Sequence, residues 1–74
     1  MPQGKIERIE RNSQFYAIYY DGYIFGATDA EAKQLDVGDI ITVTTDDRNQ
    51  VIRVETNGRV VRDGVPAEFQ RGLQ

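Results

Sequence analysis

Thirteen consecutive residues decide the fold of this chain, Phe15-Tyr16-Ala17-Ile18-Tyr19-Tyr20-Asp21-Gly22-Tyr23-Ile24-Phe25-Gly26-Ala27. Two runs of β-branched and aromatic residues flank the dipeptide Asp21-Gly22, which favours a two-residue turn and so predicts a β-hairpin. Alternate residues of a strand point to opposite faces. One face of the first strand therefore lines the core, and the other carries rings toward a loop or solvent. Phe15, Ala17 and Tyr19 form one of these faces, and Tyr16, Ile18 and Tyr20 form the other.

Turn signals on either side of this hairpin divide the rest of the chain into further short strands. The composition favours strands, since the chain has 7 Val and 7 Ile but only 2 Leu. The dipeptide Asn57-Gly58 is a second signal for a two-residue hairpin, so Arg59–Arg62 can form a short sixth strand. The five main strands are expected at Lys5–Arg11, Gln14–Tyr20, Tyr23–Ala27, Asp39–Thr45 and Val51–Thr56.

One segment, Thr28–Leu35, has the composition of a helix, and Thr28 or Asp29 can cap it. Three meandering strands, a short helix and two more strands are the plan of an OB-fold barrel. We therefore expect a small all-β protein, a five-stranded OB-fold barrel with one short helix between strands three and four. Residues 1–56 form the barrel core, 57–64 can add the extra hairpin strand, and 65–74 form a loosely ordered tail or one turn around Pro66–Phe69.

Several segments between residues 4 and 56 resemble known small barrels. Gly4-Lys5-Ile6 and Ser13–Ile18 resemble the Gly-Lys-Val opening and the Lys-Gly-Phe-Gly-Phe-Ile motif of the cold-shock domain. Tyr23–Ala27 lies where that family has Val-Phe-Val-His-Phe. The step Leu35-x-x-Gly38-Asp39 also resembles S1 domains and bacterial translation initiation factor 1, whose pattern further matches Gly4, Asn12, Phe15, Gly22 and Ala27. This resemblance implies binding of single-stranded nucleic acid through exposed rings and basic residues on strands one to three.

The chain departs from the cold-shock pattern at several positions of that aromatic platform. Phe15 and Lys5 remain, but Glu7 reverses the charge of a lysine. Stacking supplies about 1–3 kcal/mol per base, so the loss of several rings is expected to weaken this binding mode. A glycine inside a strand also marks a bulge or a close approach of another group. Where the cold-shock family has Trp, Phe, Phe and His, this chain has Arg8, Ala17, Ile24 and Gly26, in that order.

The missing residue types exclude several functions. Without Cys or His the chain has no disulfide, no ordinary zinc or haem site and no cysteine or serine–histidine nucleophile pair. It has no glycine-rich phosphate loop either, so we expect no enzyme activity, no cofactor and no metal site. The seven acids between residues 21 and 47 are interpreted as turn-formers and solubilising charge, with contact to a basic protein partner as the alternative.

Charge is distributed unevenly along the chain. The net charge of −3 comprises +1 over residues 1–20, −6 over 21–47 and +2 over 48–74. If the first and last barrel strands are close, arginines on both can form one basic strip that contacts phosphates. The alternative is a solvated surface with local ion pairs, each of which contributes little. The four arginines concerned are Arg8, Arg11, Arg48 and Arg53.

These observations lead to a main and an alternative functional hypothesis. The first is a binding protein for single-stranded RNA or DNA, RNA in preference to DNA, with modest affinity that depends on salt. The alternative is a protein-interaction module that uses an acidic face or an exposed sheet edge to dock on transcription or translation machinery. The nucleic-acid-binding residues are predicted to be Lys5, Arg8, Phe15, Tyr19, Ile24 and Arg53.

Location and assembly are predicted from the same residues. The start of the chain lacks the apolar segment of a signal peptide, and no apolar stretch approaches the roughly 18 residues of a membrane-spanning helix, so we expect a cytoplasmic protein without a membrane partner. Pairing of Asn57–Arg62 with a second copy would give a dimer by edge addition. A monomer is favoured over that dimer.

Overall fold

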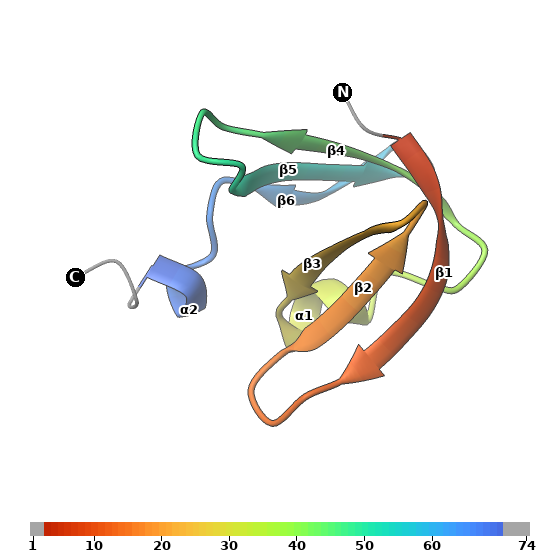
Figure 1. Cartoon of the computed structure of the whole chain (residues 1–74), viewed down its shortest axis with the longest axis horizontal. Helices are drawn as coiled ribbons and strands as arrows, with labels where there is room; N and C mark the ends of the chain where they lie inside the picture. The colour runs from red at the N-terminus through yellow and green to blue at the C-terminus, as the bar shows by residue number, and fades with distance from the viewer. Residues whose placement is uncertain (1–2, 71–74) are drawn as a thin grey trace.

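The computed structural model describes residues 3–70 and contains one antiparallel sheet of six strands (Figure 1). The expected all-β fold is confirmed, with its sixth strand and with a short helix between strands three and four. The elements are β1 Gln3–Arg11, β2 Tyr16–Tyr20, β3 Tyr23–Ala27, α1 Asp29–Ala32, β4 Ile40–Thr45, β5 Val51–Thr56, β6 Arg59–Asp63 and α2 Ala67–Gln70.

The sheet is open, with strand order β3-β2-β1-β4-β5-β6, so the expected closed barrel is not formed. The reason is that β5 has β4 on one edge and β6 on the other, which leaves no edge of β5 for β3. In the long strand β1, Gln3–Lys5 pair with β4, while residues from Ile6 to Arg11 pair with β2. We call β1-β2-β3 the first half-sheet and β1-β4-β5-β6 the second half-sheet.

Both predicted two-residue hairpins are present. Asp21 and Gly22 have φ angles of 47° and 82°, and Asn57 and Gly58 have φ angles of 51° and 74°. Positive φ at both central residues is the mark of a type I′ turn, whose twist matches that of the strands it joins. The turns therefore fix the registers of β2 with β3 and of β5 with β6, apart from a shift in β6 between Val60 and Arg62.

The core lies between the two half-sheets and is closed at one end by the segment around α1. Thr28 caps α1 with a capping box, in which Thr28 and Glu31 bond each other's main-chain N–H. The helical turn then carries Leu35 into the core, where this side chain is 3% exposed. The other buried apolar members of this core are Ile6, Ile18, Tyr20, Phe25, Ala27, Ile41, Val43 and Val54.

The C-terminal segment differs in part from the loosely ordered tail expected over residues 65–74. Ala67–Gln70 form α2, and Phe69 N–H donates to Pro66 O at 3.0 Å, which agrees with the alternative of one turn around Pro66–Phe69. Residues 71–74 lie outside the described part of the chain.

Candidate nucleic-acid interface

The outer face of the first half-sheet carries a row of cross-strand neighbours. Arg8 of β1 lies opposite Tyr19 of β2, which lies opposite Ile24 of β3. These three side chains point away from the core because their strand neighbours, such as Ile18 and Phe25, are buried in it. Phe15, the residue before β2, places its ring over Gly26 of β3, and we call Arg8, Tyr19, Ile24 and Phe15 the outer row.

Arg8 and Tyr19 are held together in the outer row. The guanidinium carbon of Arg8 lies 4.2 Å from the centre of the Tyr19 ring, within the range of a cation–π contact. The Tyr19 hydroxyl donates to Glu10 Oε1 at 3.0 Å, and Arg8 Nε lies 3.5 Å from Glu10 Oε2. The ring and the guanidinium are therefore positioned before any ligand arrives, but Glu10 offsets part of the Arg8 charge.

Within the outer row, Phe15 lies at the edge of β3, above Gly26. A Cβ atom at Gly26 would come within 3.1 Å of the Phe15 ring, so the absence of a side chain there gives the ring its place. The edge of Phe69 packs against the same ring, with centroids 6.0 Å apart and planes at 86°. Phe15 keeps 36% of its surface exposed, so it can still contact a ligand.

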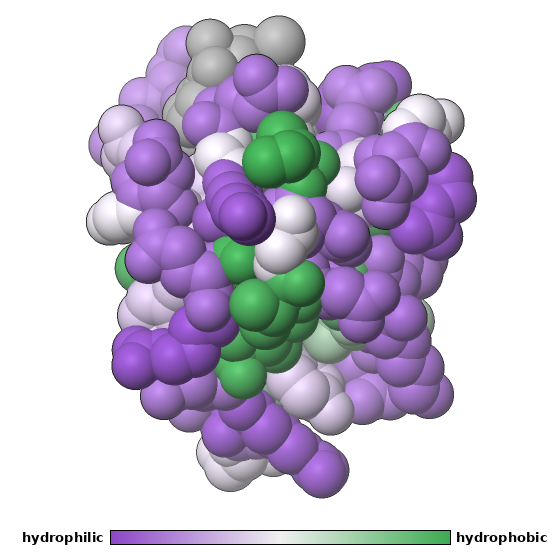
Figure 2. Space-filling model, turned by 90° about the vertical axis from the view of Figure 1, so that its right-hand side faces the viewer, coloured by the Kyte–Doolittle hydropathy of each residue, from purple (hydrophilic) through white to green (hydrophobic). Residues whose placement is uncertain are grey.

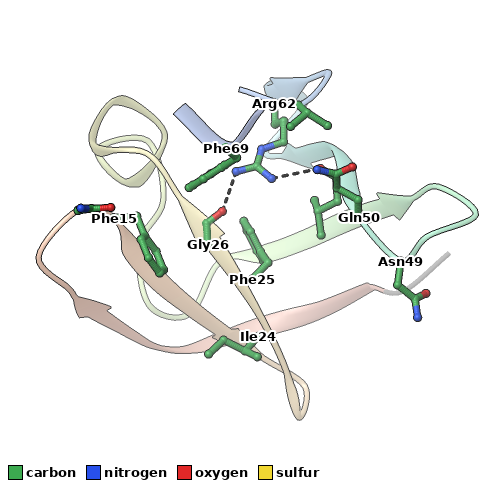
Figure 3. A pocket seen from close by; sticks show the side chains of 11 residues that line it. Phe15, Ile24, Phe25, Gly26, Asn49, Gln50, Arg62 and Phe69 are labelled. Carbon is green, nitrogen blue, oxygen red and sulfur yellow. Dashed lines mark hydrogen bonds between the residues drawn. The ribbon is translucent and has the colours of Figure 1, made fainter. Parts of the chain in front are cut away.

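A groove of about 1100 Å³ runs along the free edge of β3 (Figure 3). It separates β3 from the β4–β5 loop and from the segment before α2, and we call it the seam groove. Among the described residues, no acidic side chain lines it. Its walls combine rings with side-chain amides, among them Phe15, Phe69, Gln14, Asn49 and Gln50.

Arg62 of β6 crosses the inner end of the seam groove. Its side chain is 4% exposed and forms a two-point ion pair with Glu31, at 2.8 Å from Nε and 2.7 Å from Nη2. Nη2 also donates to Gly26 O of β3 at 2.7 Å, and Nη1 donates to Val51 O of β5 at 3.2 Å (Figure 3). One side chain thus connects β3 to β5, where a closed barrel would have a backbone ladder.

The structure brings together four of the six predicted site residues, Arg8, Phe15, Tyr19 and Ile24. Lys5 lies beyond the bulge of β1, beside β4 rather than β2. Arg53 lies on the outer face of the second half-sheet and pairs with Glu55 at 3.2 Å and Asp63 at 4.0 Å. The expected adjacency of the first and last barrel strands is wrong, because β4 lies between β1 and β5. Arg8 and Arg53 therefore do not form one basic strip.

Sequence reasoning missed the contributions of Phe69, Arg62 and Glu31. Glu31 is one of the seven acids that the sequence predicts to be turn-formers or solubilising charge, but it is buried against Arg62. Its place three residues after Thr28 is the spacing of a capping box, a signal that was present in the sequence. The Asn57-Gly58 hairpin in regular register would place Val61, not Arg62, opposite the buried Val54; the register shift after Val60 brings Arg62 to that position, and the sequence gives no signal for it.

Other acids of residues 21–47 shape turns. Asp46 Oδ1 accepts the main-chain N–H groups of Arg48 and Gln50 at 2.8 and 2.9 Å, and Asp39 accepts that of Asp36 at 3.0 Å. The bonds from Gln50 and Arg48 lower the pKa of Asp46, because they favour its charged form. Within residues 3–70, no three or more acidic side chains gather in a way that would hold a metal ion.

Two further exposed apolar side chains do not belong to the outer row. Val37 and Ile40, in the α1–β4 connection and at the start of β4, are 63% and 52% exposed. Figure 2 shows apolar atoms gathered in the middle of the face on the right-hand side of Figure 1, with hydrophilic atoms around them. Ile40 provides a control position of similar exposure to Ile24, which is 58% exposed.

Comparison with protein-family models, with curated proteins and with solved structures gives no match for this chain. Over residues 3–70, the helices are too short and too polar to cross a membrane. The function must therefore be inferred from the geometry described above.

Proposed function

We propose that this chain binds single-stranded nucleic acid on the outer row of the first half-sheet. The observation that carries this proposal is the joint presentation of two rings and a stacked guanidinium: Arg8 stacks on Tyr19, and the exposed Phe15 ring lies over Gly26 of the same half-sheet. Bases stack on aromatic rings and on arginine with little dependence on sequence, because every base has a π face. The preference for RNA rests on the resemblance to S1-like and initiation-factor domains.

The position of the seam groove supports the same proposal. OB-fold barrels bind oligonucleotides on the face of strands two and three, between the loop that joins strands one and two and the loop that joins strands four and five. In this chain the first of these loops supplies Gln14 and Phe15 to the groove, and the second supplies Asn49 and Gln50. Side-chain amides both donate and accept hydrogen bonds, so they suit the edges of unpaired bases.

The affinity is expected to be modest. The chain has a net charge of −3, and Arg8, the cation of the outer row, is countered by Glu10. Stacking then contributes more of the binding free energy than phosphate contacts do. Loss of either ring should accordingly cost about 1–3 kcal/mol, a 5- to 150-fold loss of affinity.

The test is a titration with an oligouridine of about eight nucleotides at about 50 mM salt, where phosphate contacts are strongest. We expect saturable binding that Phe15→Leu and Tyr19→Leu weaken and that Val60→Ala, a truncation on the second half-sheet, leaves unchanged. A matching oligodeoxythymidine measures the preference for RNA. Absence of binding, or an equal loss in all three variants, would contradict the proposal.

A further inference from the structure

The two free edges of the sheet are protected very differently. The edge strand β6 carries Arg59 and Asp63 and is interrupted by a register shift next to Val60. Charged residues and bulges of this kind discourage a free edge from pairing with another chain. The opposite edge strand, β3, has the sequence Tyr-Ile-Phe-Gly-Ala, with no charge, no proline and a regular register. By this criterion, β3 is the edge that is open to pairing.

The main chain of β3 presents unpaired groups to the seam groove. Tyr20 and Tyr23 flank the type I′ turn and so form the closing hydrogen-bonded pair of the hairpin, after which bonded and non-bonded pairs alternate. Ile24 and Gly26 fall in the non-bonded pairs, so their N–H and C=O groups point away from β2. The bond of 2.7 Å from Arg62 to Gly26 O independently confirms that direction. Among the described strands, none pairs with the remaining outward groups.

The charge of the seam groove favours an uncharged ligand there. Arg62 is the one cation among the described lining residues, and Glu31, Gly26 O and Val51 O together accept four hydrogen bonds from its guanidinium. It has therefore no charge to offer a phosphate. A peptide main chain, in contrast, supplies the alternating donors and acceptors that a free strand edge requires.

We infer that the free edge of β3 accepts an extended, uncharged peptide segment of a partner protein, which adds a strand to the sheet within the seam groove. A segment of about five residues spans about 17 Å, the length of β3. Its main chain bonds to Ile24 and Gly26, and its alternate side chains meet Phe15 on one side and Val51 on the other. This inference does not depend on nucleic-acid binding by the outer row, although both sites use Phe15 and Ile24.

The experiment follows main-chain amide signals of the full chain while a capped peptide of alternating Val and Thr is added to about 1 mM. We expect the largest shifts at the amides of Ile24 and Gly26. The N–H groups of an extended peptide alternate between its two edges. Two further copies of the peptide are therefore used, each N-methylated along one edge only, so that each copy can pair with a strand through its other edge alone. The copy blocked on the edge that faces β3 should bind at least about tenfold more weakly, and the other copy should bind as the parent does.

Variants of the chain provide the second arm. Ile24→Pro removes an N–H that faces the groove and no ladder bond to β2, so the hairpin should persist while peptide affinity falls at least about tenfold. Ile24→Lys places a charge on the edge and should also weaken binding, in case proline distorts the strand. Ile40→Lys, at a site of similar exposure on β4, should leave the affinity unchanged.

Three results would overturn the inference: no shift of the Ile24 and Gly26 amides, equal binding of the two N-methylated copies, or shifts of these amides by oligouridine but not by peptide. Failure of oligouridine to bind at all would contradict the nucleic-acid proposal and leave this one intact. Competition between peptide and oligouridine, which share Phe15 and Ile24, would support both proposals if Tyr19→Leu weakens oligouridine alone, because Tyr19 does not line the seam groove.

Discussion

Arg62 shows how one side chain can replace a missing backbone ladder. Its planar guanidinium reaches a carbonyl on β3, a carbonyl on β5 and both oxygens of Glu31. Such a pair must be complete, because removal of one partner leaves the other charged and buried. The pair therefore makes the open sheet sensitive to single substitutions at this point.

We predict that Arg62→Met lowers the free energy of unfolding by about 3–5 kcal/mol, since Glu31 then stays buried without a partner. The double variant Arg62→Met/Glu31→Leu should be more stable than Arg62→Met alone, because it removes the uncompensated charge. Urea denaturation monitored by circular dichroism measures both. Arg53→Gln is the control, since its ion pairs lie at the surface and contribute at most about 1 kcal/mol. A double variant no more stable than the single one would contradict this reason.

At the scale of elements, the loop between β4 and β5 depends on one carboxylate. Asp46 accepts N–H groups from Gln50 and Arg48, which hold its pKa below the ordinary value of 3.8. Its contribution to stability is therefore fully present above pH 3.8 and is lost as the pH falls through the lower, folded value.

We predict that the stability advantage of the native chain over Asp46→Ala is constant near neutral pH and shrinks as the pH falls below 3.8. Asp46→Asn keeps an oxygen acceptor that does not titrate, so its own advantage over Asp46→Ala should not change in that range. Thermal unfolding of the three proteins between neutral pH and about pH 2.5 provides the measurement. A constant difference between the native chain and Asp46→Ala throughout would disprove this role.

The elements that were predictable from sequence are those set by local rules. Asp21-Gly22 and Asn57-Gly58 specify their hairpins because few residues accept positive φ at two successive positions. Alternation in β2 predicts the two faces but not which of them is buried; in the structure Ile18 and Tyr20 lie in the core and Tyr19 faces outward. Closure of the barrel was not predictable in this way, because it depends on which distant strand takes the second edge of β5.

The candidate site was predictable to a similar degree. Arg8, Tyr19 and Ile24 share a face because strand periodicity and hairpin register bring them together. Arg53 would join them only if the first and last barrel strands were neighbours, and β4 lies between β1 and β5. Contacts between residues far apart in sequence, such as Arg62 with Glu31 or Phe69 with Phe15, require the tertiary fold and could not be obtained from periodicity.

For the molecule as a whole, the two half-sheets divide the surface chemistry. The outer face of the first half-sheet presents rings and the seam groove, whereas that of the second carries the ion pairs of Arg53 with Glu55 and Asp63. A net charge of −3 therefore describes neither half. What matters for a polyanionic ligand is the number of cations around its binding site: Arg8 lies in the outer row, and Arg48 precedes the groove-lining residues Asn49 and Gln50 in the β4–β5 loop.

This distribution predicts a weak dependence of oligouridine binding on salt. Each phosphate neutralised on a single strand contributes about −0.7 to the slope of log affinity against log salt, so one or two cations give a slope of about −0.7 to −1.4. Arg8→Gln should reduce the magnitude of that slope by about 0.7. Arg53→Gln should leave the slope unchanged, because Arg53 lies on the other half-sheet and its charge is paired. Titrations at several salt concentrations measure the slopes. A slope steeper than about −3 would mean that the ligand lies over the second half-sheet instead, and so would an equal effect of Arg8→Gln and Arg53→Gln on the slope.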